Sequence, residues 1–287
     1  MRLRKLVSLL LSRRAYHLHL EPRLFGLFDA DAAFVTANLD LFKPLVPLPV
    51  PAPAAGPLLV LGAHPDDEAV GAGGTLLLAR QKGVPISAAF LTDGRPGEGP
   101  DSEKRGEIRR AEALAAARML GAEVRFFKAR VRTLARDRAL AREAVAWVRG
   151  LIEETGPRDI FCPFPLDAHS DHRLTAWVLA RALEEALTGR AKEPIIWAYE
   201  VASLSPANAL VEIGGVEDGK AALIETYSSQ VAEFDYVNAA LGLNRYHSRH
   251  LQGRGAAEAF FRVPARAFKD LMGRFSEAQL FKEAGGR

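Results

Sequence analysis

The stretch LLVLGAHPDDEAVGAGG, residues 58–74, decides the fold of this chain. It begins with a short apolar run, Leu58–Leu61, which predicts a buried strand. A polar turn follows, and then a run of small and apolar residues that predicts a helix over Val70–Lys82. A strand that leads directly into a helix is the first half of a βαβ unit, the building block of parallel sheets.

The same alternation of strand-like and helix-like stretches continues along the chain. Further strands are expected over residues 86–91, 123–127, 159–164 and 195–201, and helices over residues 103–120, 139–154 and 172–187. A later helix is expected over residues 220–230, with edge strands over 211–213 and 260–263. The pattern predicts an α/β fold that is Rossmann-like, with a mostly parallel sheet and helices on both faces. Ligands of such folds bind beyond the C-terminal ends of the strands, so the active site is expected there.

The composition is that of an ordinary globular protein. The chain has 287 residues, of which 48% are hydrophobic and 25% charged, with a formal net charge of only +3. That charge is too small to indicate a nucleic-acid partner. The single cysteine, Cys162, excludes an internal disulfide and a multi-cysteine zinc site.

The chain divides into an N-terminal segment and a main domain. Residues 1–56 are expected to form a helical extension and a linker rich in proline and alanine, and residues 57–287 the main domain. Residues 1–14 carry a short apolar run flanked by arginines. This run lacks a signal-peptide cleavage site and is too short to span a bilayer, so a cytoplasmic location is expected. It fits either an amphipathic helix in peripheral contact with a membrane or a terminal helix packed on the domain.

The turn after the first strand has the residues of a metal site. His64 and Asp67 are three positions apart, so both side chains can project to one side of a helical turn and bind Zn²⁺. Asp66 stands beside them and could accept a proton from a metal-bound water. The alternative is that the acidic residues only complement the dipole of the following helix.

A second turn, PLDAHSDH over residues 165–172, strengthens the metal interpretation. His169 and His172 are again three positions apart and again follow a predicted strand. A catalytic zinc needs three protein ligands and one open position, and either histidine could be the third ligand. The other would then be free to act on a substrate, and the spacing does not choose between them.

Three of these motifs together resemble a known family. The string AHPDDE, the glycines of GAGG at residues 71–74 and HSDH at residues 169–172 look like the LmbE/PIG-L family of zinc-dependent N-acetylglucosaminyl de-N-acetylases. The resemblance implies removal of an N-acetyl group from an N-acetylglucosamine-type sugar, either a small molecule or a lipid-linked conjugate. It implies Zn²⁺ as cofactor, although Fe²⁺ or another divalent metal suits the same residues.

The resemblance also implies a role for each residue. His64, Asp67 and His172 would bind the metal, and Asp66 would be the general base. His169, in its protonated form, would stabilise the oxyanion or protonate the leaving amine.

Other residues are weaker candidates. Arg95, in the loop after the second predicted strand, could bind a sugar hydroxyl or a phosphate. Asp167 stands where some relatives carry a tyrosine and is expected to face the substrate. Asp171 could orient a histidine from behind. Arg109 and Glu112 are expected to form an ion pair along one helix.

Two other functions stay open at this stage. One is an amidase that acts on a non-sugar amide, and the other is a catalytically silent carbohydrate-binding accessory protein. The complete set of ligands and Asp66 argue against the silent protein. Nothing in the sequence fixes the oligomeric state.

Overall fold

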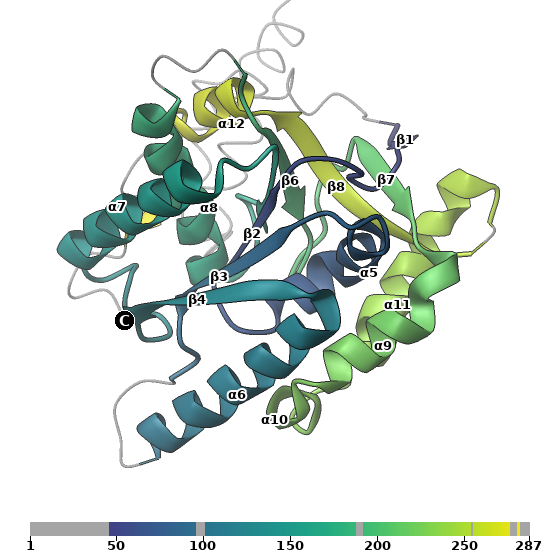
Figure 1. The fold of residues 1–287 in the computed structure, drawn as a ribbon, viewed down its shortest axis with the longest axis horizontal. Coiled ribbons are helices and arrows are strands. Elements are labelled where there is room, and N and C mark those ends of the chain that lie inside the picture. Colours follow the sequence, from purple (N-terminus) through teal and green to yellow (C-terminus); the bar gives the residue numbers. More distant parts are fainter. Residues whose placement is uncertain (1–45, 96–100, 188–191, 254, 276–279, 282–287) are drawn as a thin grey trace, which may run out of the picture.

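A computed structural model describes residues 46–95, 101–187, 192–253, 255–275 and 280–281. Its eight strands form one sheet in the order β1-β7-β8-β6-β5-β2-β3-β4 (Figure 1). All neighbouring strands are parallel except β8, which runs antiparallel to β6 and β7. The α/β fold with a mostly parallel sheet is therefore confirmed. None of the described helices combines the length and the apolar character that crossing a bilayer requires.

The strands are β1 (Leu48–Pro49), β2 (Leu58–Gly62), β3 (Ile86–Thr92), β4 (Ala122–Ala129), β5 (Asp159–Pro163), β6 (Ile195–Tyr199), β7 (Ala209–Glu212) and β8 (Ala257–Pro264). The longer helices are α5 (Asp67–Gln81), α6 (Ser102–Leu120), α7 (Arg138–Thr155), α8 (Ser170–Ala186), α9 (Glu217–Glu225), α11 (Tyr236–His247) and α12 (Ala265–Met272). The short helix α10 (Ser228–Val231) and the 3₁₀ turns η2 (Gly214–Val216) and η3 (Ser248–Leu251) connect them.

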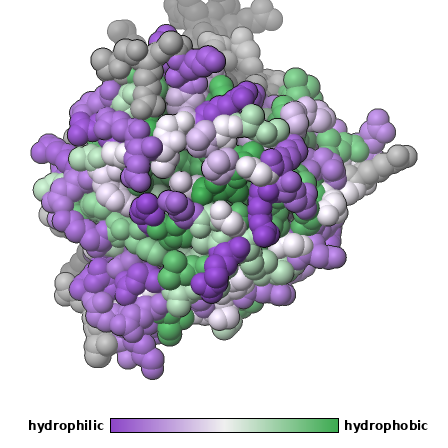
Figure 2. Space-filling model, viewed as in Figure 1, coloured by the Kyte–Doolittle hydropathy of each residue, from purple (hydrophilic) through white to green (hydrophobic). Residues whose placement is uncertain are grey.

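Helices cover both faces of the sheet (Figure 1). Successive residues of a strand point to opposite faces, so a fully apolar strand must be covered on both. In β2, Leu59 and Leu61 pack into a core with α7, α8 and α12, whereas Leu58 and Val60 pack into a second core with α5, α6 and α9. The view in Figure 2 shows hydrophilic residues over most of one side of the molecule, with apolar residues in the recesses between them.

The segment expected to be a linker is partly built into the sheet. Leu48 and Pro49 pair with Ala209 and Leu210 of β7, which adds a short edge strand. Ala52 is also buried. Proline tolerates an edge position because only one side of the strand needs hydrogen-bond donors. The predicted extension over residues 1–45 lies outside the described residues.

Small residues let helix α5 lie close to the sheet. A Cβ atom added at Gly71 would come within 2.2 Å of the Tyr199 ring, and one at Gly74 within 2.8 Å of Ile213. Contacts that close leave no room for any larger side chain. The glycines therefore hold the first turn of α5 against the strand ends, where the metal-site residues lie.

A buried ion pair also fixes α5. The Glu258 carboxylate of β8 accepts hydrogen bonds from the backbone N–H groups of Gly74 and Thr75, both at 2.8 Å. Lys220 of α9 donates to the same carboxylate at 2.6 Å and to Asn244 of α11 at 2.9 Å. Lys220 and Glu258 are both fully buried. The pair thus joins three helices and the last strand at one point.

Removing the lysine should leave a buried, uncompensated carboxylate. We expect Lys220→Met to lower the free energy of unfolding by about 3 kcal/mol, measured by urea denaturation. The matched control is Lys128→Met, because Lys128 pairs with Glu143 on the surface, where both side chains are more than half exposed. This control should lower the free energy of unfolding by less than about 1 kcal/mol. Equal losses in the two variants would contradict the role given to the buried pair.

Candidate metal and active site

The candidate site lies between the ends of two adjacent strands. His64 and Asp67 follow β2, while His169 and His172 follow β5, and β2 pairs with β5 in parallel. The chain runs from β2 to β3 on one side and returns to β5 on the other. Such a reversal of strand order opens a crevice at the C-terminal edge of a sheet. Two turns about a hundred residues apart in sequence thereby come together.

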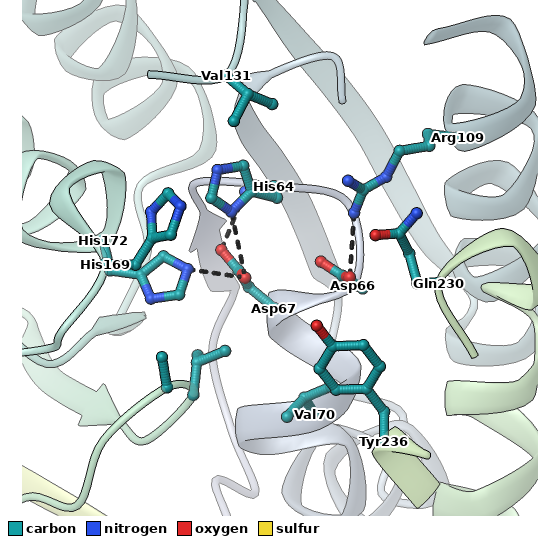
Figure 3. Close-up of a pocket in the computed structure, with 12 residues that line it drawn as sticks. His64, Asp66, Asp67, Val70, Arg109, Val131, His169, His172, Gln230 and Tyr236 are labelled. Carbon is teal, nitrogen blue, oxygen red and sulfur yellow. Dashed lines mark hydrogen bonds and ion pairs between the residues drawn. The ribbon is translucent and has the colours of Figure 1, made fainter. Parts of the chain in front are cut away.

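The ligand-type atoms of these residues converge. Within the described chain, one nitrogen from each of His64, His169 and His172 lies within 4.8 Å of the others. Asp67 Oδ1 lies 3.1 Å from His172 Nε2 and 3.7 Å from His64 Nδ1. Figure 3 shows Asp67 between the histidines and Asp66. One carboxylate and imidazole nitrogens at these separations are the donors that a divalent transition metal binds.

Each of two histidines is oriented by a carboxylate behind it. His64 Nε2 lies 3.0 Å from Asp171, and His172 Nδ1 lies 2.8 Å from Asp167. These hydrogen bonds leave His64 Nδ1 and His172 Nε2 facing Asp67. Carboxylate–histidine pairs of this kind fix the ring and the tautomer of metal-binding histidines.

His169 differs from the other two histidines. Its Nδ1 accepts a hydrogen bond from the backbone N–H of Asp171 at 3.2 Å. In the neutral ring the proton must therefore reside on Nε2, which makes that atom a donor and not a metal ligand. Burial, together with the nearby His64 and His172, lowers the pKa of His169 to about 4. The structure thus favours a neutral His169, where the sequence analysis expected a protonated one.

Asp66 is held in a strained backbone conformation beside the histidines. Its φ angle is 131°, a region that residues other than glycine rarely adopt. Its backbone N–H donates to Glu68 Oε2 at 3.3 Å, and the Tyr227 hydroxyl donates to the other oxygen of Glu68. Such a conformation costs about 1–3 kcal/mol and persists only where its surroundings enforce it.

Arg109 contacts the Asp66 side chain from the opposite wall. Its Nη2 lies 3.0 Å from Asp66 Oδ2 and donates to the Pro65 carbonyl at 2.5 Å (Figure 3). Burial raises the pKa of Asp66 to about 6, and the Arg109 charge limits the rise. A carboxyl group with that pKa can accept and release a proton near neutral pH.

The pocket formed by these residues has a volume of about 230 Å³. Its lining combines the polar residues of both turns with residues of α6, α10 and α11. They are His64, Asp66, Asp67, Val70, Arg109, Val131, His169, His172, Val201, Ala202, Gln230 and Tyr236. Figure 3 shows the Tyr236 hydroxyl directed toward Asp66 from below.

Comparison with known proteins identifies the family. The model of the PIG-L family, described as GlcNAc-PI de-N-acetylase, matches residues 59–183. A probable N-acetyl-alpha-D-glucosaminyl L-malate deacetylase 2 from Bacillus cereus is 30% identical over 192 residues, which cover 60% of this chain and 83% of the relative. The chain belongs to the PIG-L family.

Two solved structures have the same fold as this PIG-L family member. The N,N'-diacetylchitobiose deacetylase of Pyrococcus horikoshii matches with a TM-score of 0.62 at 20% identity, over 84% of this chain and 94% of that one. GalB, the 4-carboxy-2-hydroxymuconate hydratase of Pseudomonas putida KT2440, matches with a TM-score of 0.62 at 23% identity, over 73% and 96%. Identities this low show a shared fold only.

Of the two aspartates of the second turn in this PIG-L chain, Asp167 differs from what the sequence analysis expected and Asp171 does not. Asp167 is fully buried, with one oxygen bound to His172 and to the backbone N–H of His169, and the other to the N–H groups of Ala202 and Ser203. All of its acceptors therefore face protein, and it orients His172 without facing a substrate. Asp171 lies behind His64, in the orienting position suggested for it.

Arg95 does not line the pocket. Its guanidinium pairs with Asp93 and Glu103, both at 2.7 Å, so its charge is already compensated.

Arg109 forms no ion pair along its helix with Glu112. Glu112 instead accepts hydrogen bonds from Ser228 and Ser229, which joins α6 to α10.

Sequence reasoning missed Arg109, Gln230 and Tyr236 as pocket residues. Each comes from a helix that reaches the site only through tertiary packing, which the sequence analysis did not predict.

Metal retention should separate the two histidines of the HSDH turn. We expect His172→Ala to weaken zinc binding by more than the ~10–100-fold that loss of an orienting partner costs. His169→Ala should keep its zinc because its Nε2 is a donor. Metal content after dialysis, measured by plasma mass spectrometry, checks both variants. Zinc lost from His169→Ala and kept by His172→Ala would reverse their assignment.

Metal binding should also release a proton. Burial opposes the charge of His172, but the carboxylates of Asp67 and Asp167 raise its pKa to about 10 in the metal-free protein. A metal needs the neutral ring, so below about pH 10 it must displace that proton, and because the pKa of His64 is also raised, apparent affinity should rise at least roughly tenfold per pH unit. Competition with a chromophoric chelator between about pH 6 and about pH 8 measures the slope. An affinity independent of pH would contradict a protonated His172.

Proposed function

We propose that this protein is a metal-dependent hydrolase that removes the N-acetyl group from an N-acetylglucosamine-type sugar or sugar conjugate. The observation that carries the proposal is the convergence of His64, Asp67 and His172 beside Asp66 in one pocket. Membership of a deacetylase family supports the same reaction.

The fold alone would not select this reaction, since GalB is a hydratase with the same fold. The names of the Bacillus cereus relative and the Pyrococcus horikoshii enzyme both refer to deacetylation of N-acetylated sugars. The pocket volume of about 230 Å³ suits one sugar ring. A non-sugar amide is the alternative substrate, and a panel of both kinds in one acetate-release assay distinguishes them.

The proposed metal ligands are Asp67 Oδ1, His64 Nδ1 and His172 Nε2. This donor set fits Zn²⁺ and also Fe²⁺. A bound zinc ion would lower the pKa of a water molecule and polarise the acyl oxygen of the substrate. Asp67 keeps its position because its Oδ2 accepts the backbone N–H groups of Ala63 and His64 at 2.7 and 2.9 Å.

Asp66 is the proposed general base. Arg109 holds its Oδ2, which leaves Oδ1 to accept the proton of the attacking water. With a pKa of about 6, the carboxyl group can then return this proton to the leaving amine. Proton transfer by one positioned group contributes about 10²–10⁴-fold to rate.

His169 is the proposed donor to the acyl oxygen. A nitrogen of its ring lies within 4.8 Å of nitrogens of His64 and His172, and because Nδ1 is bonded to Asp171 N–H, Nε2–H is the donor it would offer to the negative charge that develops as water attacks the amide carbon. A fixed donor in a buried site stabilises that charge without reorganisation, and losing one typically costs ~10²–10³ in kcat. A neutral ring suffices for this role.

The base assignment predicts both a variant and a pH profile. Asp66→Asn should keep its zinc and lose about 10²–10⁴ in kcat, because an amide cannot accept the proton. In the unmodified protein, kcat/KM should fall at acid pH as Asp66 becomes protonated, and Asp66→Asn should lack this decline. Acetate release from N-acetylglucosamine conjugates measures both.

The matched control is Asp218→Asn, since Asp218 is an exposed carboxylate on α9. It should keep full activity and the same pH profile. Normal turnover by Asp66→Asn would show that another group takes the proton.

A further inference from the structure

A second cavity adjoins the proposed catalytic pocket between α5 and α11. Its volume is about 360 Å³, larger than that of the catalytic pocket. Four residues line both spaces: Val70, Val201, Ala202 and Tyr236. A group attached to a sugar in the first pocket can therefore extend directly into the second.

The floor and rim of this cavity are apolar. Small and aliphatic side chains form the floor, namely those of Val70, Val201, Ala239, Ala240, Leu243 and Ala259. Phe234 and Tyr236 stand at the rim with their ring centroids 4.9 Å apart in an edge-to-face arrangement. Phe234 is 55% exposed, unusually high for a large aromatic side chain. An exposed aromatic pair over an apolar floor suits the flat face of a ring-shaped ligand.

Two buried polar residues, Glu200 and Asn244, also line the cavity, and Glu200 is the charged one. Glu200 is only 6% exposed, yet it lines the cavity. Its Oε1 accepts from the backbone N–H and the hydroxyl of Ser205 at 2.6 and 3.1 Å, and its Oε2 lies 2.8 Å from His247 Nε2. Both acceptor sites of Oε1 are therefore occupied, whereas Oε2 contacts only His247 and can accept one further hydrogen bond from a ligand hydroxyl.

The charge of the lining limits what can bind. No lysine or arginine is among the described residues that line this cavity, and the one nearby histidine, His247, is already paired with Glu200. A phosphate or carboxylate would find no uncompensated positive charge there. An acyl chain would leave the remaining acceptor site of Glu200 Oε2 without a partner, and covering a polar atom in that way is unfavourable.

We propose that this cavity is a subsite for an uncharged glycosyl residue linked to the N-acetylated sugar. The inference rests on the proposed function and names the group that this cavity would bind: a neutral glycosyl residue, not an anionic or acyl-chain group. The Phe234–Tyr236 rim would contact the ring face, and Glu200 would accept from its hydroxyls.

A third cavity on the other side of the catalytic pocket supplies the control. It is bordered by Arg105, Arg109 and Glu233 and by the partly exposed Ile108, so its walls are charged. Ala239 lines the second cavity and Ile108 lines the third, and both are exposed positions on helices. A tryptophan at either position should fold and should narrow only its own cavity.

The test compares three substrates of the zinc-loaded enzyme: N,N'-diacetylchitobiose, N-acetylglucosamine and N-acetylglucosaminyl malate. We expect kcat/KM for the neutral disaccharide to exceed the other two values by about tenfold or more, equivalent to about 1.4 kcal/mol. Ala239→Trp should reduce the preference for the disaccharide over the monosaccharide about tenfold, whereas Ile108→Trp should leave that ratio as it is.

Three results would overturn the subsite. The first is a disaccharide-to-monosaccharide ratio of kcat/KM near one in the unmodified enzyme, and the second is a preference for the malate conjugate. The third is a ratio that Ile108→Trp lowers and Ala239→Trp does not. If no substrate releases acetate, the proposed function fails. Calorimetric binding of the disaccharide to zinc-loaded Asp66→Asn then decides the subsite separately. Weaker binding after adding Ala239→Trp, but not Ile108→Trp, supports the subsite, and equal binding in the two double variants refutes it.

Discussion

The Asp67 carboxylate is the contact on which the candidate site depends. One of its oxygens accepts the backbone N–H groups of Ala63 and His64, which sets the path of the chain as β2 ends and α5 begins. The other oxygen faces His64 and His172. A single side chain thus shapes its own turn and joins it to the turn after β5. Because both oxygens are used, an amide, which has only one acceptor oxygen, could not replace it.

Burial decides the protonation of the groups around that carboxylate. Burial opposes the charge of Asp67, but the neighbouring histidines hold its pKa well below the ordinary value. Asp66 and Glu68 lie on the same turn, and burial raises their pKa values to about 6 and about 8. Three consecutive carboxyl groups therefore have three different affinities for a proton. Separate proton affinities allow one group to bind a cation while its neighbour carries a proton.

The sequence was sufficient for the parts of the site that are continuous in the chain. A strand, a turn and a helix start occur together in residues 58–74 and again in residues 159–172, so the two histidine-bearing turns could be placed at strand ends. That these strands are neighbours was given by the strand order of the sheet and not by the α/β pattern. The antiparallel β8, the helices α11 and α12 and the edge strand β1 left weaker patterns, because tertiary pairing and not periodicity determines them.

The partners of the site residues were harder to predict. Arg109 and Glu112 have the spacing of a helical ion pair, but each finds a competing partner on another element, Asp66 for one and α10 for the other. Asp167 is a polar residue in the second turn and was expected to face the substrate. Its carboxylate instead points inward, where it accepts hydrogen bonds from two backbone N–H groups after β6. Such choices depend on where distant elements pack, and a single sequence carries no local record of them.

The Glu258 contact to α5 has a consequence for the order of events during synthesis. The backbone N–H groups of Gly74 and Thr75 bind a carboxylate 184 and 183 positions further along the chain. While the ribosome is still making the central strands, the middle of α5 lacks this partner, and it gains it only when β8 has emerged and inserted between β6 and β7. The helix that begins at the candidate metal site is thus completed by nearly the last strand to be made. A nascent chain released before that point would have both histidine turns but would lack the buried contact that holds the middle of α5.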